Sequence, residues 1–243
     1  MVDPPERGVE VVDLSMTIND QEYACKVVIN EAAEKGGAAI LFLHGYGECG
    51  TDGDKQLTVG LPKHAAENPE DWPFVLIVPQ KPIHNSEWED HEGAVLKMLE
   101  KASELGLYDP ERLAITGLSQ GGHGTMMFAS MHPEKFVAAT PVCGYVRPFF
   151  DGDRNRINHA EPTAETPEFV EIAAKLAALP IWIYHGDSDR AVSVNESRSL
   201  HGALDAIEAD VHYTELPGVD HNAWDDAYTD DELIAWFKKL LGE

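Results

Sequence analysis

A single serine hydroxyl stands between two glycines in the segment GLSQG, residues 117–121. The apolar run before it, residues 112–116, predicts a buried strand, and a helix is expected to begin near Gln120. Each glycine weakens the start of a helix by about 1 kcal/mol relative to alanine, so the pattern indicates a functional reason for their presence. G-x-S-x-G between a strand and a helix is typical of a nucleophile elbow, which raises the serine Oγ above the strand ends beside a helix N-terminus. Ser119 is therefore the candidate nucleophile.

A nucleophilic serine needs a general base, and after such an elbow the chain order is serine, acid, histidine. Three histidines follow the strand predicted at residues 181–186: His201, His212 and His221. His201 falls inside a predicted helix and His212 inside a predicted strand. His221 lies in the loop segment LPGVDHNAW, just past the last predicted strand, and is the candidate base.

The acid that orients the histidine is expected in YHGDSDRAV, which offers Asp187 and Asp189 directly after a strand. Asp187 follows the strand so closely that its carboxylate is well placed to accept local backbone N–H groups. Asp189 lies two residues farther out, where the loop can turn toward His221. The spacing favours Asp189 and leaves Asp187 open.

An oxyanion hole needs two backbone N–H groups close to the nucleophile. One is predicted at Gln120, the residue after the serine, and the other at Tyr46 in LHGYGECG, with Gly47 as the second choice. Trp88 and Trp224 flank loops at the same predicted sheet edge. We expect these two indoles to line an acyl-binding pocket.

The elements around these residues alternate between short apolar runs and amphipathic segments. An antiparallel pair is predicted at residues 9–14 and 22–29, followed by buried strands at 38–45, 74–80, 112–117, 137–144, 181–186 and 210–216. Helices are predicted at 86–106, from 120, from about 166, at 195–207 and at 229–242, with capping boxes at Ser86–Glu89 and Thr229–Glu232. The pattern predicts one α/β domain over residues 1–243, with a mostly parallel sheet, helices on both faces and an antiparallel edge pair.

One polar segment interrupts this alternation between the strands at 137–144 and 181–186. Long irregular insertions in compact domains are commonly binding loops or lids. The insertion, at about residues 145–170, leaves the sheet at the predicted catalytic edge. We therefore expect it to cover the substrate pocket as a partial lid.

The chain is strongly acidic, with 43 Asp and Glu against 18 Lys and Arg in 243 residues, a formal net charge of −25. This excess argues against nucleic acid and anionic membrane surfaces as partners. It fits either a well-solvated surface or adaptation to high salt, in which counter-ions screen the repulsion.

Composition also limits cofactors and location. Cys25, Cys49 and Cys143 lack metal-ligand spacing and are predicted to be free thiols, and TDGD at 51–54 lacks the rest of a calcium loop. We expect no metal site. The sequence shows no apolar stretch of about 18 residues and no signal-peptide pattern, so it is expected to be cytoplasmic, or secreted with its signal removed.

These motifs resemble the α/β-hydrolase family, in its small esterase and predicted peptidase branch, near the acyl-protein thioesterases, dienelactone hydrolases and feruloyl esterases. The matching segments are FLHGYGE, VPQ, EGAVLKMLE, LAITGLSQGGHGTM, HGDSDRAV and GVDHNAW. The resemblance covers nearly the whole chain and implies a Ser–Asp–His serine hydrolase without a cofactor. It also implies that the second aspartate of HGDSD, Asp189, is the catalytic one.

The sequence thus predicts a serine hydrolase that cleaves small carboxylic esters with short-chain or aromatic acyl groups through an acyl-enzyme. A small serine peptidase or amidase would use the same machinery and is the first alternative. A non-catalytic binding module on the same fold is the second.

Overall fold

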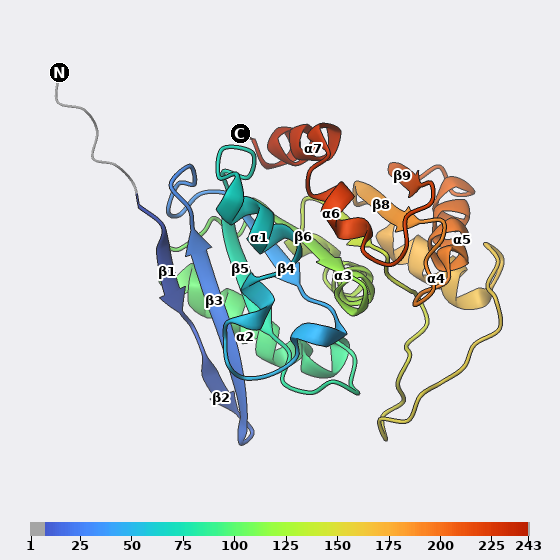
Figure 1. Ribbon diagram of the computed structural model, residues 1–243, viewed down its shortest axis with the longest axis horizontal. Coiled ribbons are helices and arrows are strands. Elements are labelled where there is room, and N and C mark those ends of the chain that lie inside the picture. The colour runs from blue at the N-terminus through green and yellow to red at the C-terminus, as the bar shows by residue number, and fades with distance from the viewer. Residues whose placement is uncertain (1–7, 243) are drawn as a thin grey trace.

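The computed structural model describes residues 8–242, which form one mixed sheet of nine strands with helices on both faces (Figure 1). The strand order is β1-β3-β5-β4-β6-β7-β8-β9, and β2 pairs with β3 beside this path. Pairs from β5 through β9 are parallel, while β1, β2 and β5 each pair antiparallel with β3. The strands are β1 Glu10–Asp13, β2 Met16–Ile18, β3 Gln21–Ile29, β4 Ala39–Leu43, β5 Val75–Gln80, β6 Leu113–Leu118, β7 Ala139–Val142, β8 Ile181–Gly186 and β9 Val211–Leu216.

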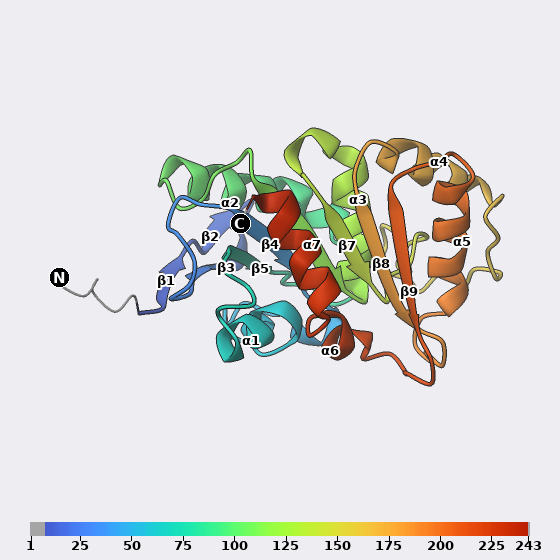
Figure 2. The same cartoon turned by 90° about the horizontal axis from the view of Figure 1, so that it is seen from above.

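Alternation along β4 explains why helices cover both faces of the sheet. All five residues of this strand are buried, and successive side chains point to opposite faces. Leu41 and Leu43 join a core beneath α2, α3, α4 and α5, whereas Ile40 and Phe42 join a second core beneath α1, α6 and α7. Figure 2 shows α1 and α6 on the side of the sheet opposite α2 and α4. The predicted three-layer α/β arrangement is confirmed.

The helices within residues 8–242 follow five predicted segments, two of them with corrected starts, and two further helices, α1 and α6, were not predicted. They are α1 Gly60–Glu67, α2 Glu92–Glu104, α3 Gln120–Met131, α4 Pro167–Leu176, α5 Val194–Asp205, α6 Ala223–Ala227 and α7 Asp231–Leu241, with 3-10 turns η1 Tyr46–Glu48, η2 Lys55–Leu57, η3 Glu89–His91 and η4 Pro133–Lys135. The capping box at Ser86 is wrong, because its hydroxyl is bonded to Ile83 and His91 and α2 begins six residues later. At α7 the cap is Asp230, whose side chain accepts from the Glu232 N–H, rather than Thr229.

The carboxyl ends of the parallel strands meet at one edge of the sheet. There β4 leads into η1, β6 into α3, β7 into the long insertion and β8 into the loop with the two aspartates. Figure 1 shows the insertion, in yellow, extending from the body of the molecule as a long loop before α4. Every helix within residues 8–242 is too short or too polar to cross a bilayer.

Candidate active site

Ser119 connects the end of β6 to the start of α3 in a strained conformation. Its φ of 55° and ψ of −116° lie outside the backbone regions that residues other than glycine normally adopt. The N–H of Ser119 donates to the Val142 carbonyl at 2.9 Å, and its carbonyl accepts from the His123 N–H at 3.0 Å. A Cβ at Gly121 would lie 1.8 Å from the Leu43 carbonyl oxygen, so only glycine fits there. The turn holds the Ser119 hydroxyl above the strand ends, as an elbow requires.

The structure brings Ser119, His221 and Asp189 together in a hydrogen-bonded line. Ser119 Oγ lies 2.8 Å from His221 Nε2, and His221 Nδ1 lies 2.7 Å from Asp189 Oδ2. The Asp189 side chain is fully buried, whereas the His221 side chain is 25% exposed. The imidazole therefore remains open to a substrate while its orienting carboxylate does not.

The two aspartates of HGDSD have different partners. Asp189 Oδ1 accepts from the backbone N–H groups of Ala191 and Val192 at 2.8 and 2.9 Å, which fixes the carboxylate in its loop. Asp187 Oδ1 accepts from the Gly218 N–H at 2.7 Å and from the Ser188 hydroxyl at 2.8 Å. Of the two, Asp189 is the one hydrogen-bonded to His221.

A second histidine contacts the buried carboxylate. His185 Nε2 lies 3.2 Å from Asp189 Oδ2 and 3.2 Å from the Val192 carbonyl, while its Nδ1 lies 2.7 Å from Ser197 Oγ. Because two acceptors face Nε2, the proton belongs on that nitrogen and Nδ1 accepts from the serine. Burial alone would raise the pKa of Asp189, but hydrogen bonds from His185 and His221 hold it well below its ordinary value.

The loop that carries His221 packs directly on the end of β8. A Cβ at Gly186 would lie 2.2 Å from the Val219 carbonyl oxygen, so this close approach requires glycine. The Ser188 N–H also donates to the Val219 carbonyl at 3.0 Å. This packing sets the distance between the two loops from which Asp189 and His221 meet.

The two residues predicted to supply oxyanion-hole N–H groups, Tyr46 and Gln120, each begin a helical turn beside Ser119 in the cavity lining. Gln120 is the first residue of α3 and Tyr46 the first residue of η1, and the N–H groups at a helix start have no partner within the helix. Both residues line the same cavity as Ser119. The two predicted oxyanion donors thus follow the neighbouring strands β4 and β6 into the cavity that contains Ser119.

A buried histidine and tryptophan hold the loop before Tyr46. His44 Nε2 accepts from the Lys81 N–H at 2.8 Å, so its proton sits on Nδ1, which donates to the Gly45 carbonyl at 2.6 Å. Burial lowers the pKa of His44 to about 3 and keeps the ring neutral. Trp88 Nε1 donates to the His44 carbonyl at 3.1 Å, and the two rings meet edge to face.

The prediction that Trp88 lines the acyl pocket is wrong. Trp88 is 1% exposed, because its side chain packs against Gly124 of α3. Its indole N–H donates to the His44 carbonyl. Trp224 lines a shallow neighbouring hollow of about 440 Å³, where its ring meets the His221 ring edge to face at 5.6 Å. Trp224 therefore contacts the imidazole of His221 and is not among the residues that line the cavity over Ser119.

A cavity of about 450 Å³ lies over Ser119, and most of its wall was not identified from the sequence. It is lined by Tyr46, Asn85, Ser119, Gln120, Tyr145, Phe149, Phe150, Arg156, Ala191, Val192 and His221. Four of these residues, Tyr145, Phe149, Phe150 and Arg156, come from the insertion. The aromatic pair within a polar loop was the sequence signal that could have pointed to them.

Glu87 is a buried carboxylate behind this cavity that sequence reasoning missed. Its Oε1 accepts from the Phe149 and Phe150 N–H groups at 2.7 and 3.0 Å, and its Oε2 accepts from Tyr145 Oη at 2.8 Å and Gln120 Nε2 at 3.0 Å. Four hydrogen-bond donors therefore satisfy the Glu87 carboxylate. The contacts join the insertion to the first residue of α3.

One group in the part of the chain described could place three ligand atoms around a metal ion. Atoms of Cys143, Asp189 and His221 lie within 4.8 Å of one another. Burial raises the pKa of the Cys143 thiol well above its ordinary value, so it stays protonated, and the other two groups are hydrogen-bonded to each other. This donor set suits proton transfer better than metal binding. Cys25 and Cys49 are buried free thiols as well.

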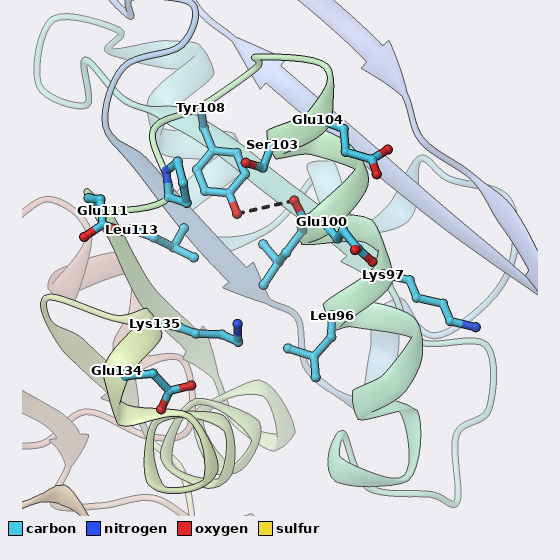
Figure 3. A pocket seen from close by; sticks show the side chains of 12 residues that line it. Leu96, Lys97, Glu100, Ser103, Glu104, Tyr108, Glu111, Leu113, Glu134 and Lys135 are labelled. Atoms are coloured by element: carbon cyan, nitrogen blue, oxygen red, sulfur yellow. Dashed lines mark hydrogen bonds between the residues drawn. The ribbon is translucent and has the colours of Figure 1, made fainter.

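A larger hollow, about 600 Å³, lies away from these residues, between α2 and η4 (Figure 3). Charged side chains from both elements surround it, among them Lys97, Glu100 and Lys135. Tyr108 closes its floor by donating to the Leu99 carbonyl at 3.3 Å. It contains no group arranged as a nucleophile and base.

The chain is similar to known hydrolases in sequence and in fold. The profile of the prolyl oligopeptidase family matches residues 93–243. An uncharacterized secreted protein of Arthroderma benhamiae is 30% identical over 125 residues, which are 48% of this chain and 13% of that protein. A thermostable esterase is 26% identical with a TM-score of 0.76 and covers 94% of this chain, which in turn covers 62% of that chain. The acylaminoacyl peptidase of Pyrococcus horikoshii shares the fold, with 16% identity, a TM-score of 0.68, and 96% and 41% coverage.

Proposed function

Because the chain belongs to the prolyl oligopeptidase family of α/β-hydrolases, we propose that it is a serine hydrolase that cleaves small carboxylic esters through an acyl-enzyme. The line from Ser119 Oγ through His221 to Asp189, with contacts of 2.8 and 2.7 Å, is the observation that carries the proposal. The likeness to a thermostable esterase over 94% of the chain supports the ester substrate.

The proposed reaction begins at Ser119 Oγ, which attacks the acyl carbon as His221 Nε2 takes its proton. Asp189 keeps the imidazole proton on Nδ1 and stabilises the imidazolium that forms. The N–H groups of Tyr46 and Gln120 donate to the developing oxyanion. His221 then protonates the leaving alcohol, and water releases the acyl group by the same steps in reverse order.

The cavity supports short or aromatic acyl groups. Its volume is about 450 Å³, and Tyr46, Tyr145, Phe149 and Phe150 form its apolar wall. The residues from the insertion act as a partial lid on a single domain. The proposed partner is a small ester, and neither nucleic acid nor a membrane surface has a part in the reaction.

A serine peptidase is the second candidate, and the prolyl oligopeptidase family match favours it specifically. Both activities would use the same three residues, so only substrates separate them. We expect the purified chain to hydrolyse 4-nitrophenyl acetate, 4-nitrophenyl butyrate and a feruloyl ester far faster than a peptide amide. A rate maximum at palmitate, or faster cleavage of the amide, would contradict the ester proposal.

Labelling with a fluorophosphonate separates both enzymes from a non-catalytic binding module. We expect wild type and Ser130→Ala to be labelled on the peptide that contains Ser119, and Ser119→Ala to remain unlabelled. Ser130 is a suitable control because it lies in the same helix and its hydroxyl donates to the Met127 carbonyl of that helix. An unlabelled wild type would remove both enzyme assignments.

A further inference from the structure

Four side chains stack face to face from the core beneath α3 to the cavity over Ser119. The rings of His123 and Tyr145 are 4.6 Å apart at 11°, and those of Tyr145 and Phe149 are 3.9 Å apart at 9°. The guanidinium carbon of Arg156 lies 4.1 Å from the centre of the Phe149 ring. We name His123, Tyr145, Phe149 and Arg156 the stacked column.

Two carboxylates, the half-buried Glu89 and the buried Glu87, fix the inner layers of the column. Glu89 pairs with His123 Nε2 at 3.1 Å, and Glu87 accepts from the Tyr145 hydroxyl and the Phe149 N–H. Since each inner layer is held by an ion pair or a hydrogen bond, the face that Phe149 presents to Arg156 is set from inside the protein.

The backbone fixes Arg156 as well. Residues 150 and 156 form a bridge, and the Ile157 N–H donates to the Phe149 carbonyl at 2.8 Å. Between them Asp151 closes a tight turn, its carboxylate accepting from the Asp153 and Asn155 N–H groups. The outermost layer is therefore positioned before any substrate arrives, which lowers the cost of ordering it on binding.

The charge of the residues that line the cavity differs in sign from the net charge of the whole chain. Acidic residues outnumber basic ones 43 to 18, yet none of the eleven residues that line the cavity is Asp or Glu, and Arg156 is the permanent cation among them. Within residues 8–242, Arg156 contacts the Phe149 and Phe150 rings and pairs with no carboxylate. The nearby Glu87 is buried and takes four hydrogen bonds of its own.

We propose that Arg156 binds a carboxylate of the substrate, so that the preferred esters carry a free negative charge. A guanidinium stacked on a ring through its face keeps its N–H donors in its own plane, where they can hold a carboxylate with two parallel hydrogen bonds. The inference rests on the proposed ester hydrolysis and names its substrate class. Arg156 determines specificity and takes no part in the proton transfers.

Two pairs of esters, each matched for shape, test the charge on either side of the scissile bond. For the acyl side, the mono-4-nitrophenyl ester of adipic acid is compared with 4-nitrophenyl hexanoate. For the alcohol side, 4-carboxyphenyl acetate is compared with its methyl ester. We expect kcat/KM to favour the charged member of at least one pair in wild type, and the pair affected identifies the side of the ester that Arg156 contacts.

Variants separate this contact from general charge effects. Arg156→Gln should lower kcat/KM for the charged ester by about 10- to 100-fold, mainly through KM, and change the neutral ester less than about twofold. Arg156→Lys should retain part of the preference. Arg154→Gln removes the same charge from the same loop outside the cavity lining and should leave the preference unchanged.

The outcomes distinguish this inference from the function on which it rests. Hydrolysis of the neutral esters without a preference for the charged ones, or equal losses for both members in Arg156→Gln, overturns the substrate class alone. Wild type that hydrolyses none of the four esters overturns the ester proposal itself. Circular dichroism of each variant confirms that the comparison is made on folded protein.

Discussion

The indole Nε1 of Trp88 donates a hydrogen bond of 3.1 Å to the backbone carbonyl of His44. That carbonyl lies two residues before Tyr46, whose N–H is a proposed oxyanion donor. The tryptophan therefore supports the position of a reacting group from inside the core, without touching the cavity. This relationship gives a residue first expected to bind substrate a role in positioning the loop.

Replacing Trp88 by phenylalanine keeps most of the ring and removes the N–H donor. We expect kcat for 4-nitrophenyl acetate to fall by about tenfold with little change in KM, because an oxyanion contact matters most in the transition state. Trp182→Phe is the matched control, since it loses an indole bond to Thr214 of 2.9 Å in the core on the other side of the sheet. Equal losses of kcat in both variants would show that the effect is one of stability.

The two aspartates of HGDSD should respond differently to the same substitution. Asp189→Asn should lower kcat by about 10⁴-fold, because the amide favours the wrong tautomer of His221. Asp187→Asn should keep activity and lose about 1 kcal/mol of stability, since it weakens the bond from the Gly218 N–H. Ester turnover and urea unfolding of both variants measure the two effects. An inactive Asp187→Asn beside an active Asp189→Asn would reverse the assignment.

Sequence patterns were informative where one residue type has a narrow physical use. Only glycine fits at position 121, because any Cβ would meet the Leu43 carbonyl. The glycine therefore helped to identify the strand–turn–helix context of Ser119. The alternating apolar runs predicted the parallel sheet for the same reason: strands buried on both faces tolerate few polar residues. The choice of Asp189 over Asp187 rested on the reach of the loop, a local property, together with the resemblance to the α/β-hydrolases.

Contacts between distant segments were beyond the sequence. The burial of Trp88 depends on its packing against Gly124, 36 positions away, and nothing local to Trp88 encodes it. The stacked column likewise forms only when the insertion, which carries Tyr145, Phe149 and Arg156, packs against His123 of α3. At α7, Thr229 and Asp230 are both good caps, and the final backbone geometry selects Asp230.

The ion pair between buried His123 and half-buried Glu89 should make stability depend on pH. Burial disfavours the imidazolium, but the Glu89 carboxylate outweighs it and raises the pKa of His123 from 6.5 to about 9. The folded protein therefore holds a proton that the unfolded chain releases between these values. The stabilisation is fully present below pH 6.5 and is lost as the pH rises through 9.

Glu89→Gln removes this effect and isolates it. We expect the variant to be less stable than wild type by on the order of 2 kcal/mol near pH 6, and the difference to shrink above pH 9. Thermal unfolding from pH 5.5 to 10 measures it, with Glu111→Gln as a control that removes one exposed acidic charge elsewhere. A difference that stays constant across this range would exclude the ion pair as its source.

The excess of acidic residues should make the fold more stable in salt. With a net charge of −25, exposed carboxylates repel one another, and raising KCl to 1 M shortens the screening length to about 3 Å. We expect the melting temperature to rise by several degrees between low salt and molar KCl. A variant with Glu31, Glu34, Asp71 and Glu100 replaced by Gln or Asn carries four fewer exposed charges and should gain less from the same salt. If both proteins gain equally, the salt acts through burial of apolar surface rather than through screening, and a flat curve would leave the charge as a determinant of solubility alone.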